Sequence, residues 1–277
     1  MRRVPRRVVG AMINLVRAQW FRLMRNRAFW GLLAVFAGVV LVASLQVTER
    51  GLYEEAYRNI PLLAQHSPAA MVSMTMDVEA VMGEFWTPQL LALIIALLSA
   101  GFFGDDFRFR GTRLLAAGPH FRAAYVISAL CIVLLSAMIF LAAAMAATWA
   151  GLLPNPGLGV WVDGGRFGRW ALELMIIAAT YALVVLAVVA ATGRTGWGAL
   201  VAVLLSGGVA STALLSISWA LGCEEVLRPL IAAMPAAQLG QLSIEGVTPG
   251  AFDILPLLGW LAAAAGLCWA VLRRRAL

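Results

Sequence analysis

Six apolar runs, separated by short polar segments, constrain this chain more than any other feature. Each run is close to the roughly 20 residues that a helix needs to cross a bilayer, where a helix satisfies its own backbone hydrogen bonds. We predict spans at 29–47, 85–103, 123–149, 170–191, 197–219 and 254–272. The chain is 62% hydrophobic and 13% charged, whereas a soluble domain averages about 45–50% and about 25%. The sequence therefore predicts an all-α integral membrane protein with one six-span membrane domain, 29–277, and no internal repeat.

The basic residues are distributed unevenly over the two sides of this topology. The sequence contains no lysine, and all 21 basic residues are arginines. Residues 1–28, the loop 104–122, Arg194 and the tail 273–275 would share one side and hold 16 of the 21 arginines. Because positive charge is retained in the cytoplasm, we predict a multi-pass protein with both termini cytoplasmic.

Tryptophans accompany the ends of the predicted spans. Indole rings favour the membrane interface, where one part of the ring is apolar and the N–H is polar. The tryptophans at or next to a span end are Trp30, Trp86, Trp149, Trp170, Trp197, Trp219 and Trp269. We expect these rings to form the aromatic belts of the protein.

The N-terminal segment, 1–28, has helical periodicity. Over 11–29 apolar residues recur at steps of three and four, which is typical of an amphipathic helix lying in the interface. We expect Trp20 on its apolar face and Arg17, Arg22 and Arg25 on its wet side. An ordinary basic juxtamembrane segment is the alternative.

The polar island 104–122, GDDFRFRGTRLLAAGPHFR, joins the second and third spans. Its charges predict a cytoplasmic loop, and Thr112 as N-cap with a stop at Gly118-Pro119 predicts a short helix within about 105–120. Such a rigid basic helix suits docking of a soluble partner. The residues that we assign to docking are Asp105, Asp106, Arg108, Arg110, Gly111, Thr112, Arg113, Leu114, Leu115, Pro119 and Arg122. The two aspartates either pair with Arg108, Arg110 or Arg113, or cap and solvate the helix end.

Three outer loops are predicted at 48–84, 150–169 and 220–253. The first contains Met71, Met74, Met76 and Met82, whose thioethers could bind Cu(I), although an adaptable apolar face is the simpler interpretation. The third is interrupted by prolines and predicts short helices folded back at the outer surface.

Catalytic and metal-binding patterns are missing from the sequence. The lack of lysine excludes a P-loop of the form GxxxxGK[ST], and no Ser/His/Asp set or HExxH motif can be assembled. His66 and His120 have no further ligand at metal-binding spacing, so we predict no metal, no resident cofactor and no enzymatic activity. Glu173, near the outer end of the fourth span, could line a substrate route or form an i,i+4 ion pair with Arg169. Arginines beside spans are explained by topology and lipid, so no nucleic acid is expected.

The pattern as a whole resembles the permease subunits of ABC-2 type ABC transporters. The resemblance covers nearly the whole chain and is sharpest over GTRLLAAGPHFRAAYVISAL, residues 111–130. Family members carry a similar Gly-Thr, Leu-Leu, Pro and Arg pattern between spans two and three, usually with a glutamate four residues before the Gly-Thr pair. Phe107 stands at that position in this chain, and Ser128 occupies the region where a lysine is often found.

This resemblance implies a function and a set of partners. It implies a pair of permeases, identical or different, in a bacterial or archaeal-type plasma membrane. It also implies a cytoplasmic ATP-binding subunit that supplies ATP and Mg²⁺ and docks on the helix between spans two and three and on the interfacial helix. The nearly charge-free spans favour export of a hydrophobic or amphipathic compound, such as a drug, an antimicrobial peptide or a lipid-linked molecule. A membrane anchor that recruits a partner without transporting anything is the rival hypothesis.

Overall fold

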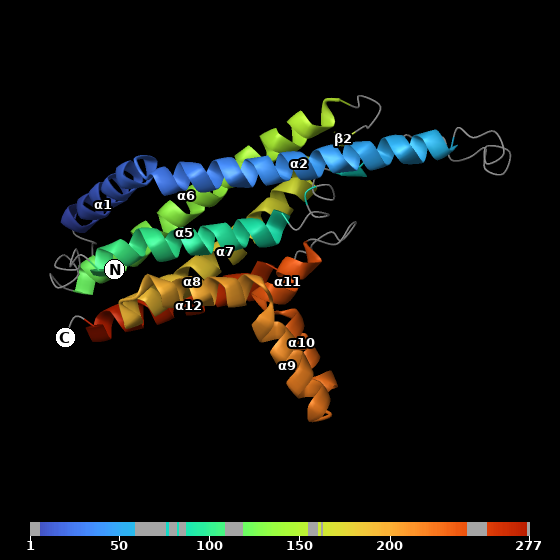
Figure 1. Cartoon of the computed structure of the whole chain (residues 1–277). Coiled ribbons are helices and arrows are strands. Elements are labelled where there is room, and N and C mark those ends of the chain that lie inside the picture. The colour runs from blue at the N-terminus through green and yellow to red at the C-terminus, as the bar shows by residue number, and fades with distance from the viewer. Residues whose placement is uncertain are drawn as a thin grey trace.

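The computed structural model describes residues 6–58, 76–77, 82, 87–108, 119–154, 160–161, 163–242 and 254–275. Long helices dominate these residues (Figure 1). They are α1 (Arg6–Met24), α2 (Arg27–Arg58), α5 (Thr87–Arg108), α6 (Pro119–Leu152), α7 (Gly164–Thr192), α8 (Thr195–Ser206), α9 (Val209–Ala220), α10 (Glu224–Ala232), α11 (Pro235–Gln241) and α12 (Ile254–Arg275). Two-residue strands, β1 (Met76–Asp77) and β2 (Val160–Trp161), form a parallel pair that connects the first two predicted outer loops.

Five of these helices are long and apolar enough to cross a membrane. The candidate spans are Arg27–Gln46, Thr87–Phe107, Arg122–Leu152, Gly164–Thr192 and Ile254–Arg274. The pair α8 and α9 makes a sixth if the two helices are taken as one span. The prediction of an all-helical multi-pass membrane protein is thus confirmed at five or six spans.

The fifth predicted span, 197–219, is not one straight helix. α8 and α9 are bent by 57° at Gly207 and Gly208. Gly208 has a φ of +68°, in the left-handed region that glycine adopts without steric cost. The apolar run continues through the bend, so hydropathy alone predicted an uninterrupted helix.

The N-terminal segment also ends differently from the prediction. A single helix was expected over 11–29, whereas α1 ends at Met24 and α2 begins at Arg27. The side chain of Asn26 accepts a hydrogen bond from the Ala28 N–H at 2.9 Å, as an N-cap does. The Trp30 indole N–H donates to the Met24 carbonyl at 2.8 Å and so satisfies a free carbonyl at the end of α1. α1 and α2 are therefore distinct helices joined by a capped corner.

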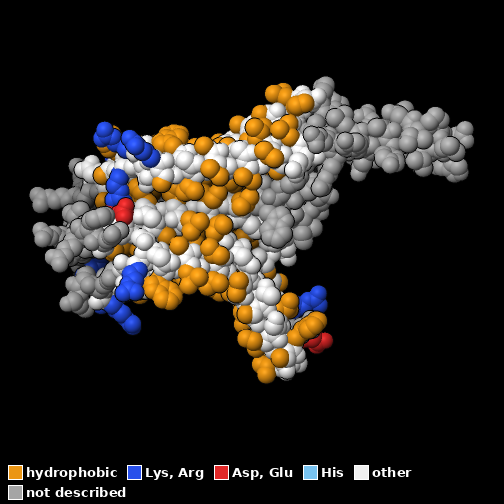
Figure 2. Space-filling view, in the orientation of Figure 1, with side chains coloured by type: hydrophobic (Ala, Val, Ile, Leu, Met, Phe, Trp, Pro, Cys, Tyr) orange, Lys and Arg blue, Asp and Glu red, His pale blue; other side chains and the backbone are white. Residues whose placement is uncertain are grey.

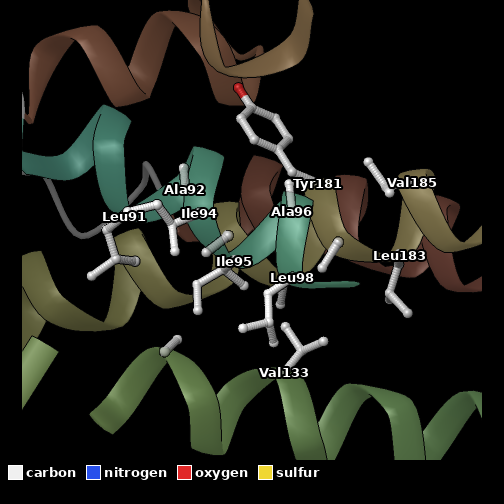
Figure 3. Packing of buried hydrophobic residues seen from close by; sticks show 14 of the residues in the cluster. Leu91, Ala92, Ile94, Ile95, Ala96, Leu98, Val133, Tyr181, Leu183 and Val185 are labelled. Atoms are coloured by element: carbon white, nitrogen blue, oxygen red, sulfur yellow. The ribbon is translucent and has the colours of Figure 1, made fainter. Parts of the chain in front are cut away.

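α7 is the central helix of the bundle. It packs against α5, α6, α8, α11 and α12, and most of its side chains are buried. Figure 3 shows Ile95 and Ala96 of α5 beside Tyr181 and Leu183 of α7, with Val133 of α6 below them. Because lipid tails are as apolar as these side chains, the association is stabilised mainly by close van der Waals packing.

Small residues allow helices to approach closely. A Cβ added to Gly198 of α8 would overlap the Cγ2 atom of Val189 and lie 3.2 Å from the Ala100 Cβ. A Cβ on Gly104 of α5 would overlap the Thr195 Cγ2 atom of α8. These glycines let α5, α7 and α8 meet at one end of the bundle.

Most of the described arginines lie at that same end. Arg17, Arg22, Arg25, Arg122, Arg194 and Arg273 are on α1, on the first turn of α6, in the α7–α8 turn and on the last turns of α12. Figure 2 shows basic side chains gathered there, while the projecting hairpin of α9 and α10 carries Arg228. We call this end the arginine-rich end. It agrees with the predicted charge asymmetry.

Gly198→Ala should destabilise the bundle by about 1–3 kcal/mol, because an extra methyl group in a closely packed interface forces its neighbours to shift. Thermal unfolding of detergent-purified protein, followed by fluorescence-detected size exclusion, measures this as a lower Tm. Gly196→Ala, two residues earlier, is the control, because nothing lies within 4 Å of its added Cβ. An equal Tm for the two variants would contradict the packing described above.

Candidate functional site

The predicted docking segment lies between the C-terminus of α5 and the N-terminus of α6. Asp105, Asp106 and Arg108 form the last turn of α5, and Pro119 begins α6. Residues 109–118, with Arg110, Gly111, Thr112, Arg113, Leu114 and Leu115, lie outside the described residues. The short helix predicted there stays a prediction. The described part of the candidate site consists of the two helix ends that flank these residues.

Arg22 connects α1 to the end of α5. Its guanidinium forms a salt bridge with the Asp106 carboxylate and donates a second hydrogen bond to the Phe102 carbonyl. The guanidinium carbon also lies 4.1 Å from the centre of the Phe102 ring, which is a cation–π distance. One arginine thus makes a charged, a polar and a ring contact with a single turn of α5.

Tyr125 of α6 completes this cluster. Its hydroxyl donates to Asp106 Oδ2 at 2.9 Å, while Arg22 binds Oδ1. The Tyr125 ring makes edge contacts with Phe103 and Phe107, with centroids 6.1 and 6.2 Å apart. Both carboxylate oxygens of Asp106 are therefore occupied, one by α1 and one by α6.

We call Arg22, Phe102, Asp106 and Tyr125 the Asp106 cluster. The Asp106 carboxylate accepts hydrogen bonds from side chains of α1 and α6, two helices that are far apart in sequence. The side chain of Asp106 is 17% exposed and that of Arg22 is 45% exposed, so the ion pair lies at the boundary between protein and solvent. A partly desolvated, hydrogen-bonded pair is stronger than a fully exposed one. The cluster therefore fixes three helix ends to one another at the arginine-rich end.

Sequence reasoning assigned Asp106 a role but not this partner. We expected it to pair with Arg108, Arg110 or Arg113 or to cap a helix, whereas the described partners are Arg22 and Tyr125. No spacing rule relates Arg22 to Asp106, because the two are separated by 84 residues. Asp105 is exposed beside it.

α1, the helix predicted to lie in the interface, has exposed arginines and a side packed against the bundle. Arg17 and Arg25 are exposed, Trp20 is half-buried and Leu23 is buried. α1 packs along α6, and Arg25 lies 5.0 Å from the Phe21 ring centre on the exposed side. Arg22 differs from the prediction because part of its side chain is directed into the Asp106 cluster.

Two further features lie at the arginine-rich end. Arg122 Nη1 approaches the Arg273 carbonyl of α12 at 3.5 Å. A shallow groove opens at the α7–α8 turn, lined by Gly193, Arg194, Thr195, Gly196, Trp197 and Leu200. The docking-segment ends, α1 and this groove therefore occupy the same end of the molecule.

Glu173 does not belong to this site. It lies near the start of α7, toward the opposite end of the bundle, and is 2% exposed. Nearby, the Trp170 indole N–H donates to the Leu242 carbonyl at 3.1 Å and fastens the end of α11 to α7. Trp170 was predicted to lie in an aromatic belt, but it is buried in the protein. Arg169, the expected ion-pair partner of Glu173, is exposed.

Metal ligands do not gather in the part of the chain that the structure describes, where no three His, Cys, Asp or Glu side chains are placed to hold an ion. Of the methionines in the first outer loop, Met82 is buried. The side chains of Met71, Met74 and Met76 lie outside the described residues.

Comparisons with known proteins do not place the chain in a family. No family model matches the sequence, and no curated protein matches it. The fold and the site define a multi-pass helical membrane protein with a basic end at which three helices are tied together.

The Asp106 cluster predicts measurable coupling between Arg22 and Asp106. We expect Arg22→Gln and Asp106→Asn each to lower stability, and the double variant to lose less than the sum, with a coupling energy of about 1 kcal/mol. Thermal unfolding of the three variants and the wild type gives this value. Asp105→Asn is the matched control, for which we expect an unchanged Tm. Strict additivity of the Arg22 and Asp106 variants would show that the salt bridge contributes nothing.

Proposed function

We propose that this chain is the permease subunit of an ATP-driven transporter of the ABC-2 type. It would export a hydrophobic or amphipathic compound and take its energy from a separate cytoplasmic ATPase that holds ATP and Mg²⁺. The observation that supports this proposal most is the Asp106 cluster, which joins the interfacial helix α1 to both helices that flank the docking segment. The sequence resemblance assigns partner docking to these same two elements.

The contacts suggest how a docked partner would act on the bundle. A force applied to residues 109–118 would reach Asp106 at the end of α5 and Tyr125 near the start of α6. Because Asp106 is bonded to Arg22, α1 would move with these helix ends rather than independently. α5 packs on both α7 and α8, so its displacement would be passed to the centre of the bundle. The nearly charge-free spans favour an apolar or amphipathic cargo.

The orientation and assembly belong to the same proposal. The arginine-rich end would face the cytoplasm of a bacterial or archaeal-type cell, with both termini on that side. A second permease, identical or different, would complete the membrane unit. The rival function is a membrane anchor that binds a cytoplasmic partner through the same basic end but moves no substrate.

Purification from the native host in mild detergent tests the docking surface. We expect an ATPase to co-purify with the tagged chain. The amount recovered should be about tenfold lower with Arg110→Glu/Arg113→Glu, since unfavourable charge at an interface costs several kcal/mol. Arg169→Glu/Arg228→Glu is the matched control, because both of these arginines are exposed away from the arginine-rich end. Equal recovery of the ATPase with both double variants would remove the docking assignment.

ATP hydrolysis in reconstituted complexes then separates a transporter from an anchor. We expect candidate hydrophobic substrates to stimulate hydrolysis in the wild-type complex. In Asp106→Asn the partner should still co-purify while the stimulation is lost, since the contacts of Asp106 with α1 and α6 are weakened but residues 109–118 are unchanged. A complex that forms normally and shows no stimulation by any candidate would favour the anchor.

A further inference from the structure

The hairpin formed by α9 and α10, Val209–Ala232, leaves the helix bundle (Figure 1). The chain turns away at Gly208, and α9 and α10 pack against each other. The Trp260 indole N–H of α12 donates to the Ala233 carbonyl at 2.9 Å and fixes the base of the hairpin to the bundle. The hairpin is therefore an anchored projection with a defined direction.

Large apolar side chains cover this projection. α9 contains no charged residue, and Trp219 and Val226 are 71% and 77% exposed, among the highest values for large apolar side chains in the described chain. The exposed apolar residues of the hairpin are Val209, Leu215, Ile217, Trp219, Leu221, Val226 and Leu230. Exposing this apolar surface to water would cost about 25 cal/mol of free energy per Å².

The charged side chains of the hairpin that the structure describes lie on one side. The described ones are Glu225 and Arg228, both exposed on α10. In Figure 2 the acidic and basic atoms of the hairpin are on its right side, which faces away from the arginine-rich end. An apolar body with charges on one side is the pattern of a helix pair lying in a membrane interface.

The length of α8 sets the depth at which the hairpin leaves the bundle. α8 has 12 residues and is about 18 Å long, which is shorter than the roughly 30 Å hydrocarbon core of a bilayer. α8 begins at the arginine-rich end, so the bend at Gly207 and Gly208 lies inside the thickness that α7 and α12 span. α9 therefore starts within the apolar layer and not in water.

We propose that the α9–α10 hairpin lies in the lipid leaflet opposite the arginine-rich end, with α9 among the acyl chains and the charged side of α10 at the headgroups. The partner is the phospholipid bilayer itself. One acidic and one basic described side chain give no preference for anionic lipid, so a zwitterionic headgroup layer is sufficient. The inference does not depend on the proposed transport function, because an anchor protein would carry the same hairpin.

Spin labels at single cysteines test this placement. In a Cys131→Ala/Cys223→Ser/Cys268→Ala background, a nitroxide is attached to Ile217→Cys on α9 or to Glu225→Cys on α10, and the protein is reconstituted in phosphatidylcholine vesicles. Collision with oxygen reports exposure to acyl chains, and collision with a water-soluble nickel chelate reports exposure to water. Arg194→Cys, at the arginine-rich end, supplies the aqueous reference, and Val35→Cys, exposed on α2, supplies the acyl-chain reference.

We expect the label at position 217 to resemble the one at 35 and the label at 225 to collide mainly with nickel. Nickel collision at both 217 and 225, as at 194, would place the hairpin in water and overturn the proposal. Low collision with both reagents, together with dipolar broadening that disappears on dilution with unlabelled protein, would assign the hairpin to a second copy and overturn it equally.

Tryptophan quenching repeats the test in the chain with its own cysteines. Brominated phosphatidylcholine quenches indoles that lie in the acyl region, so Trp219→Phe should lower the quenchable share of the total emission. Trp170→Phe is the control, because this buried indole lies inside the protein and its removal should raise the quenchable share. An unchanged quenchable share in Trp219→Phe would contradict the lipid placement.

Discussion

The bundle depends on the enclosure of α7. This helix contacts five others, and its faces are lined by alanine, valine and leucine that pack at van der Waals distance. In a bilayer the exclusion of water contributes little to helix association, so the fit of these surfaces is the main stabilising term. Gly104 and Gly198 contribute to this fit, because neither has a Cβ atom, which would overlap a side chain of a neighbouring helix.

Polar interactions are concentrated at the two ends of this apolar bundle. At the arginine-rich end the Asp106 carboxylate receives hydrogen bonds from α1 and α6. At the opposite end, tryptophan side chains of α7 and α12 bind the carbonyls of Leu242 and Ala233. The interior between these two ends is packed mainly from apolar side chains.

Much of this architecture was predictable from the sequence, and the reasons for the rest are physical. Span positions follow from apolar length, and five of the six predicted spans coincide with a long apolar helix. The bend at Gly207 and Gly208 was not predicted, because two glycines are common in membrane helices and hydropathy does not change there. The Arg22–Asp106 pair was also missed, since contacts across 84 residues depend on how helices pack and not on local pattern. Trp170 was expected in the interface because a span-end tryptophan looks the same in sequence whether it faces lipid or another helix.

The two indole hydrogen bonds have a practical consequence. Each joins a long bundle helix to the backbone just after a short helix, at Leu242 beyond α11 and at Ala233 beyond α10. Indole emission is sensitive to the loss of an N–H hydrogen bond and to the entry of water. Any rearrangement that lifts the short helices from the bundle would therefore change the intrinsic fluorescence of the protein. Trp170 and Trp260 are therefore intrinsic fluorescent probes of the attachment of these short helices.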